Sequence, residues 1–134
     1  MLKVAIIGSR EYTDRRKIKD MVFKLKEKYG ADIEIVSGGQ AKGADGFAKK
    51  SALEFDMKYV EFPPASYHWN QHCIMPPTDY GKTYRVWHYS DRNKQVAEYS
   101  DIILAFLPNA VVKGGTADTL KHAKKANKKI LVFD

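Results

Sequence analysis

Three glycine-rich turns, each following an apolar run typical of a β-strand, are the parts of this chain best suited to bind a ligand. They contain Gly8-Ser9-Arg10, Ser37-Gly38-Gly39 and Gly114-Gly115-Thr116. Glycine lets a ligand approach the backbone, and the free N–H groups of a helix N-terminus suit a phosphate. In an open parallel sheet such turns lie along one edge, at the carboxyl ends of the strands, so we expect them to meet around one cleft. These residues therefore predict a nucleotide-like ligand.

The polar residues near these turns each allow two interpretations. Arg10 could hold a phosphate bidentately or be an ordinary surface arginine. The second turn continues into Gly43-Ala44-Asp45-Gly46, where Asp45 either suits the positive end of a helix dipole or contacts a ribose hydroxyl. Thr116 is expected to be the N-cap of a further helix. Asp118, in the first turn of that helix, either suits its dipole or lies beside a sugar.

Other chemistries are disfavoured by the motifs. Gly8 does not begin a G-x-G-x-x-G run, and neither a P-loop nor a G-x-S-x-G turn occurs. We therefore do not expect NAD bound in the usual Rossmann manner, a P-loop NTPase or an α/β-hydrolase. Four residues invite a metal-binding interpretation: His68, His72, Cys73 and His88. No second compact ligand pair accompanies them, so we expect no metal and no cofactor, and favour aromatic packing instead.

Alternating strand and helix patterns predict an α/β fold, a single Rossmann-like domain with a five-stranded parallel sheet and helices on both faces. The expected strands are 3–7, 33–37, 58–62, 101–106 and 129–133, and the expected helices are 15–29, 44–55, 91–99 and 116–126. The first helix has Asp14 or Thr13 as its N-cap and Gly30 as its stop. A strand order of 3-2-1-4-5 puts the switch point between the first and fourth strands. Gly8 and the turn at 114–116 should then flank one crevice.

Length and composition fit one domain spanning residues 1–134 with a proper core. An irregular, aromatic-rich insertion is expected at about 63–90. A loop of this length in a compact domain is usually functional or contains an unrecognised helix. The single cysteine and the lack of a signal-peptide or membrane-helix pattern favour a cytoplasmic protein. The net charge of +7 reflects either solvated lysines or a field that attracts anionic ligands or nucleic acid. We favour solvated lysines, because aromatic residues are not interleaved with them.

Together these motifs resemble the SLOG superfamily of Rossmann-like nucleotide-ligand proteins, and its small YspA-like branch most of all. The resemblance spans nearly the whole chain and rests on Gly8-Ser9-Arg10, Ser37-Gly38-Gly39-x-x-x-Gly43-Ala44-Asp45, the region of Trp69, Arg92-Asn93 and Gly115-Thr116. The superfamily also holds the LOG enzymes, which cleave the N-glycosidic bond of nucleoside monophosphates. The DNA-processing protein DprA and nucleotide-sensing domains of bacterial conflict systems belong to it too.

The LOG pattern is only partly present. Arg92 matches that family's functional arginine, and Asn93 replaces its lysine, as in the YspA-like form. Gly115-Thr116 match its anion-binding turn, which the resemblance implies is kept. Asp118 stands where its first catalytic glutamate would be, but Thr119 replaces the second.

We therefore expect a nucleotide-binding protein whose ligand is a nucleoside monophosphate or an ADP-ribose-like molecule. Phosphate would contact Gly115-Thr116 and Arg92. The turn at 37–39 and Asp45 would hold the sugar or a second phosphate, and an aromatic residue of segment 65–90 would cover the base. The remaining expected ligand-binding residues are Gly8, Ser9, Arg10, Gly43, Trp69, Asn93 and Gly114.

Two other functions stay open. The first is a LOG-like N-glycosidase, in which Asp118 stabilises the sugar cation or activates water and Arg92 orients the phosphate. The less favoured one is a DprA-like module that binds nucleic acid. Exposed helix faces would permit a homo-oligomer, and no membrane partner is expected.

Overall fold

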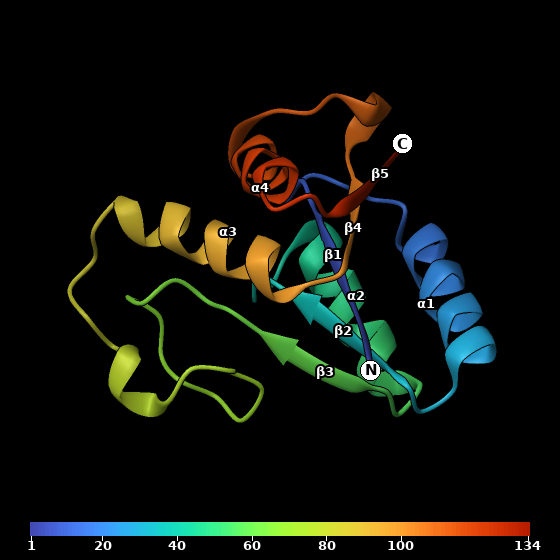
Figure 1. Cartoon of the computed structure of the whole chain (residues 1–134), viewed down its shortest axis with the longest axis horizontal. Coiled ribbons are helices and arrows are strands. Elements are labelled where there is room, and N and C mark those ends of the chain that lie inside the picture. Colours follow the sequence, from blue (N-terminus) through green and yellow to red (C-terminus); the bar gives the residue numbers. More distant parts are fainter.

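A computed structural model describes all 134 residues and shows five parallel strands in the order β3-β2-β1-β4-β5 (Figure 1). The strands are β1 (Leu2–Gly8), β2 (Ile33–Ser37), β3 (Lys58–Glu61), β4 (Ile102–Phe106) and β5 (Lys129–Phe133). Strand β1 pairs with β2 on one side and with β4 on the other. The predicted fold class and strand order are confirmed. The chain reverses its direction of winding between β1 and β4, where an open sheet leaves a crevice.

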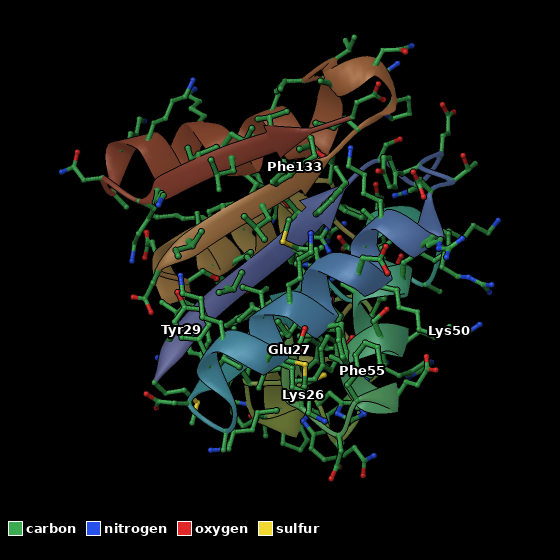
Figure 2. All side chains as sticks on the ribbon, turned by 90° about the vertical axis from the view of Figure 1, so that its right-hand side faces the viewer. Lys26, Glu27, Tyr29, Lys50, Phe55 and Phe133 are labelled. Carbon is green, nitrogen blue, oxygen red and sulfur yellow. The ribbon has the colours of Figure 1, made fainter.

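Helices α1 (Arg15–Tyr29) and α2 (Gly43–Glu54) cover one face of the sheet. Figure 2 shows α1 running across this face with α2 beside it. Helix α1 begins as predicted, because the Asp14 side chain accepts a hydrogen bond from Lys17 N, and it ends at Gly30. Helix α2 turns the small residues Ala44, Ala48 and Ala52 to the sheet, and each is fully buried. The small side chains let α2 pack close to the strands that carry the glycine turns.

Helices α3 (Trp87–Tyr99) and α4 (Gly114–Lys125) cover the opposite face. A second apolar cluster, which includes Val96, Leu120 and Ala123, packs there against Ile7 and Ile103. Short 3-10 turns at Pro77–Asp79 and Pro108–Ala110 complete the elements. None of the helices has the length and apolar character needed to cross a membrane.

Residues 63–86 form an insertion between β3 and α3, and we call this segment the insertion from here on. It is fastened beside β3, where Glu61 N donates to His72 O at 2.9 Å and Ile74 N donates to Glu61 O at 3.3 Å. Helix α3 begins at Trp87 and not at Asp91, so the prediction missed its first turn. The reason is local: Val86, the N-cap residue, makes no side-chain capping bond, and no start signal precedes the helix.

Candidate functional site

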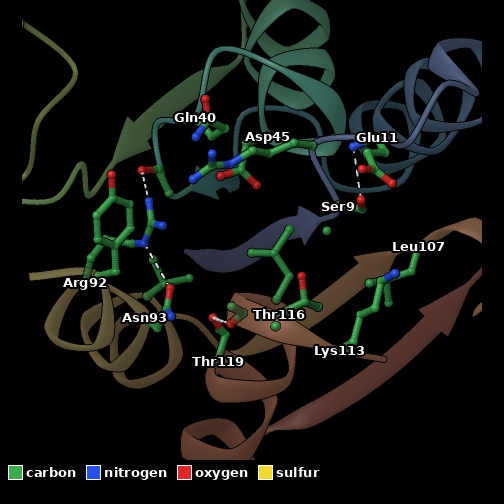
Figure 3. Close-up of a pocket in the computed structure, with 18 residues that line it drawn as sticks. Ser9, Glu11, Gln40, Asp45, Arg92, Asn93, Leu107, Lys113, Thr116 and Thr119 are labelled. Carbon is green, nitrogen blue, oxygen red and sulfur yellow. Dashed lines mark hydrogen bonds between the residues drawn. The ribbon is translucent and has the colours of Figure 1, made fainter. Parts of the chain in front are cut away.

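A cavity of about 520 Å³ opens at the carboxyl edge of the sheet, between the ends of β1 and β4 (Figure 3). Gly8, Gly38 and Gly115 all line it, so the three predicted turns do meet around one cleft. Its other lining residues are Ile7, Ser9, Arg10, Glu11, Gln40, Asp45, Tyr89, Arg92, Asn93, Val96, Leu107, Lys113, Gly114, Thr116 and Thr119. Because only four of the eighteen residues are hydrophobic, the cleft suits a polar ligand.

The N-terminus of α4 forms one wall of the cleft. Lys113 is the N-cap residue and its side chain makes no capping hydrogen bond. Gly114 has φ of +60°, a conformation that glycine adopts without strain. It is the first residue of α4 and lines the cleft. The predicted N-cap, Thr116, is instead in the first turn, so that prediction was wrong by three residues. The uncapped N–H groups and the positive end of the helix dipole favour an anion here.

Arg92, on α3, lies across the cleft from α4 and is held in place by two hydrogen bonds. Its Nη1 donates to the carbonyl oxygen of Gly38, and its Nε donates to Asn93 Oδ1 at 2.9 Å. A Cβ at Gly38 would lie 2.6 Å from Arg92 Nη1, so a larger residue there would displace the guanidinium from its present position. Burial lowers the pKa of Arg92, while the nearby Asp45 raises it. Arginine remains charged under such conditions, so the cleft contains a fixed cation whose remaining N–H groups can donate to a ligand.

Asn93 links the cleft to Asp118 on α4. Its Nδ2 donates to Asp118 Oδ2 at 3.1 Å, and Ser90 Oγ donates to the same oxygen at 3.2 Å. The other oxygen, Oδ1, lies 3.6 Å from His122 Nε2. The Asp118 carboxylate is thus directed to α3 and to its own helix, and it does not line the cavity. This geometry makes Asp118 a residue that positions Asn93.

Asp45 is the buried carboxyl group of the cleft. It lies in the first turn of α2, and its residue is only 8% exposed. Burial raises its pKa to about 6, although Arg92 and the backbone N–H groups of Gln40 and Gly38 act in the opposite direction. The desolvation of the carboxylate therefore outweighs its favourable partners. This group therefore changes its charge near pH 6, inside the cleft.

The junction of the first two turns is built from close backbone contacts. Ala44 N donates to Ser9 O at 3.2 Å, so the N-terminus of α2 is already occupied by the protein. Gly43 has φ of +67°, and a Cβ there would lie 2.1 Å from Ser9 O. Ser9 Oγ in turn accepts a hydrogen bond from Glu11 N. The turn at 43–46 therefore packs against the loop after β1 and fixes the shape of that wall.

Several predicted site residues lie outside the cavity lining. Ser37 is buried below the turn, where its hydroxyl accepts from Gly39 N and contacts Tyr59 Oη at 2.6 Å. Gly39 faces the insertion, because a Cβ there would lie 3.0 Å from Pro63 Cγ. Trp69 is half-exposed on the insertion and donates through Nε1 to Met75 O at 3.3 Å. Gly43 and Asp118 do not line the cavity either.

Several residues that line the cleft were not predicted from the sequence. Glu11 and Gln40 follow the first two turns in loops, and Lys113 precedes the third. Thr119 lies one turn after Gly115 and donates through Oγ1 to Gly115 O at 3.1 Å, a spacing that helix periodicity could have revealed. Tyr89 lies one turn before Asn93 on α3. Its position became predictable only once the true start of α3 was known.

A family model with the description "YspA, cpYpsA-related SLOG family" matches residues 2–72, slightly more than half of the chain. The matched part includes the first two glycine turns. The chain therefore belongs to this family, as its motifs predicted. A comparison with curated proteins gave no match.

Two kinds of solved structure resemble the fold at low sequence identity. One is the molybdenum cofactor binding protein from the phototrophic bacterium Rippkaea orientalis, with a TM-score of 0.68 and 17% identity over 96% of this chain and 74% of that one. The other is the Moco carrier protein from Chlamydomonas reinhardtii, with a TM-score of 0.68 and 18% identity over the same shares. At these identities the likeness establishes a common fold.

Proposed function

We propose that this SLOG-family protein binds a nucleotide or nucleotide-derived small molecule by its phosphate, in the cleft between β1 and β4. The observation that carries the proposal is the placement of the uncapped N-terminus of α4 opposite Arg92. A phosphate between them would receive backbone N–H groups from one side and guanidinium donors from the other. Both elements line the same cavity, so the donors are already in place on its two sides.

The charges around the cleft support an anionic ligand. Arg10, Arg92 and Lys113 supply three cationic side chains, against the carboxyl groups of Glu11 and Asp45. Asp45, with a pKa of about 6, is mostly ionised at pH 7 and opposes an anion there, but the positive side chains still outnumber the two carboxylates. The balance of charge, together with the helix dipole, therefore favours a phosphate over a neutral ligand.

Binding is favoured over N-glycosidase chemistry by the position of Asp118. A glycosidase needs a carboxylate that reaches the sugar, and here both Asp118 oxygens face α3, Ser90 and His122. The structural neighbours are described as proteins that bind or carry the molybdenum cofactor. By analogy we propose a small-molecule-binding role for this chain, and that cofactor belongs in the set of compounds to test.

The experiment is isothermal titration calorimetry with nucleoside 5′-monophosphates and ADP-ribose, on the wild type and on Arg92→Ala. Removing Arg92 should weaken binding by about 1.5–3 kcal/mol, the range for a hydrogen bond to a charged group. Arg16→Ala is the matched control, because Arg16 is exposed on α1 and lies outside the cleft. Equal affinity of the wild type and Arg92→Ala would remove Arg92 from the binding site. No binding of any phosphorylated compound would refute the proposal.

A further inference from the structure

A second cavity, of about 360 Å³, lies between the insertion and α3. Figure 1 shows the insertion running beside α3, on the side away from α4. Arg92 lines this cavity as well as the cleft, so the two spaces adjoin at its side chain. The walls of the second cavity include Met75, Asp79 and Tyr80 of the insertion and Trp87 and His88 of α3.

Two of these lining residues have buried polar atoms without a hydrogen-bond partner. His88 is only 9% exposed, and its Nδ1 has no partner. The hydroxyl of Tyr80 is also buried and has no partner apart from the neighbouring Cys73 thiol, which is a weak acceptor. Buried polar groups in native proteins are nearly always hydrogen-bonded, because an unpaired one is costly. These two residues of one cavity wall therefore have hydrogen-bonding capacity that the rest of the protein leaves largely unused.

The charges of the second cavity differ from those of the cleft. Asp79 and Asp91 balance Lys82 and Arg92, so the cavity has no excess of positive charge to attract a second phosphate. The indole of Trp87 and the thioether of Met75 add apolar surface. An uncharged planar ring with hydrogen-bonding groups on its edge fits this combination, because Tyr80 Oη can donate or accept and His88 Nδ1 is a second hydrogen-bonding atom.

We propose that the second cavity is the base subsite of the nucleotide whose phosphate binds in the cleft. The inference rests on the proposed function. The ligand passes beside Arg92, with the phosphate on the side of α4 and the base between the insertion and α3. The insertion then selects the base, while the glycine turns and α4 hold the phosphate.

The test compares two kinds of probe on each variant by calorimetry. The first is a set of the 5′-monophosphates of adenosine, guanosine, cytidine and uridine, and the second is ribose 5-phosphate, which has no base. At least one nucleotide should bind about tenfold or more tightly than ribose 5-phosphate. Tyr80→Phe should lower the affinity for that nucleotide about 2- to 10-fold, the effect of one neutral hydrogen bond. Trp87→Ala should lower it about fivefold or more, as expected for a lost stacking partner.

Neither substitution should change the affinity for ribose 5-phosphate, whereas Arg92→Ala should weaken both probes. Tyr84→Phe is the matched control, since Tyr84 is an exposed tyrosine of the insertion outside both cavities. Tyr80→Phe should change the melting temperature little, because the hydroxyl that it removes has only the weak Cys73 acceptor as a partner. A nucleotide affinity equal to that for ribose 5-phosphate, or unchanged in both variants, would overturn the base subsite and leave phosphate binding intact. If no probe binds at all, the proposed function fails and the subsite fails with it.

Discussion

Asp45→Asn should change how the stability of this protein depends on pH. Burial raises the pKa of Asp45 from 3.8 to about 6, in spite of Arg92 and two backbone N–H groups. A shift of roughly two units corresponds to about 3 kcal/mol between the protonated and ionised forms. Because the folded pKa exceeds the unfolded one, the folded state binds more protons. The stabilising contribution of Asp45 is therefore complete below pH 3.8 and is lost as the pH rises through about 6.

Asparagine keeps the shape of the protonated carboxyl group and cannot ionise. The free energy of unfolding of Asp45→Asn, minus that of the wild type, should thus rise by up to about 3 kcal/mol between pH 4 and pH 7.5. Taking the difference cancels the other titrating groups that the two proteins share. Urea denaturation at several pH values, followed by circular dichroism, measures it.

The control is Asp20→Asn, which makes the same chemical change at an exposed position of α1. A difference for Asp45→Asn that stays constant with pH would refute the reasoning. If the wild type gained stability relative to Asp45→Asn as the pH rises, ionisation of Asp45 would stabilise the fold, the opposite of what we expect. In that case attraction to Arg92 would outweigh the desolvation of the carboxylate.

Three further substitutions test the framework of the site. Gly43→Ala should destabilise the protein by about 3 kcal/mol or more, because a Cβ at this positive φ clashes with backbone atoms. Gly30→Ala is the control and should lose only about 1 kcal/mol, because Gly30 has φ of +58° but open space around it. Equal losses in urea denaturation would contradict the close packing of α2. Glu61→Ala should destabilise the protein by about 2–3 kcal/mol, because it leaves the donors of Tyr59 and Asn70 unpaired. Limited proteolysis should also become faster within residues 63–86. An unchanged digestion pattern would argue that Glu61 does not hold the insertion in place. Chromatography should detect no free base after the wild type is incubated with nucleoside monophosphates, and base release that disappears in Asp118→Asn would instead establish glycosidase activity.

The sheet and its glycine turns were predictable because their signals are local. Apolar runs placed the strands, and Asp14 and Gly30 marked the ends of α1, since capping depends on a single side chain or a positive φ. The strand order followed from the handedness of the crossovers and the choice of a central first strand. Gly8, Gly38 and Gly115 then had to share one edge of the sheet.

The orientation of side chains within the site was not predictable in the same way. Asp118 lies two residues after Thr116, so on a helix it faces away from the cleft that Thr116 and Thr119 line, toward α3. That distinction depends on where α4 begins, and a start at Gly114 without a capping side chain leaves no sign in the sequence. The role of Arg92 depends on α3 in the same way. Only the packing of α3 against the Gly38 turn brings its guanidinium to the cleft.

The burial of Glu61 bears on which parts of this chain can change without disturbing the cleft. Its carboxylate accepts hydrogen bonds from Tyr59 and from Asn70 of the insertion, and it pairs with Lys49 of α2 at 3.3 Å. The insertion is thereby joined to the domain at its root. Two contacts that hold the glycine turns at the cleft, between Ser9 and Ala44 and between Gly38 and Arg92, do not involve the insertion. Changes in the length or sequence of the rest of this segment should therefore leave the turns of the cleft in place, so that the wall of the second cavity can vary while most of the cleft is kept.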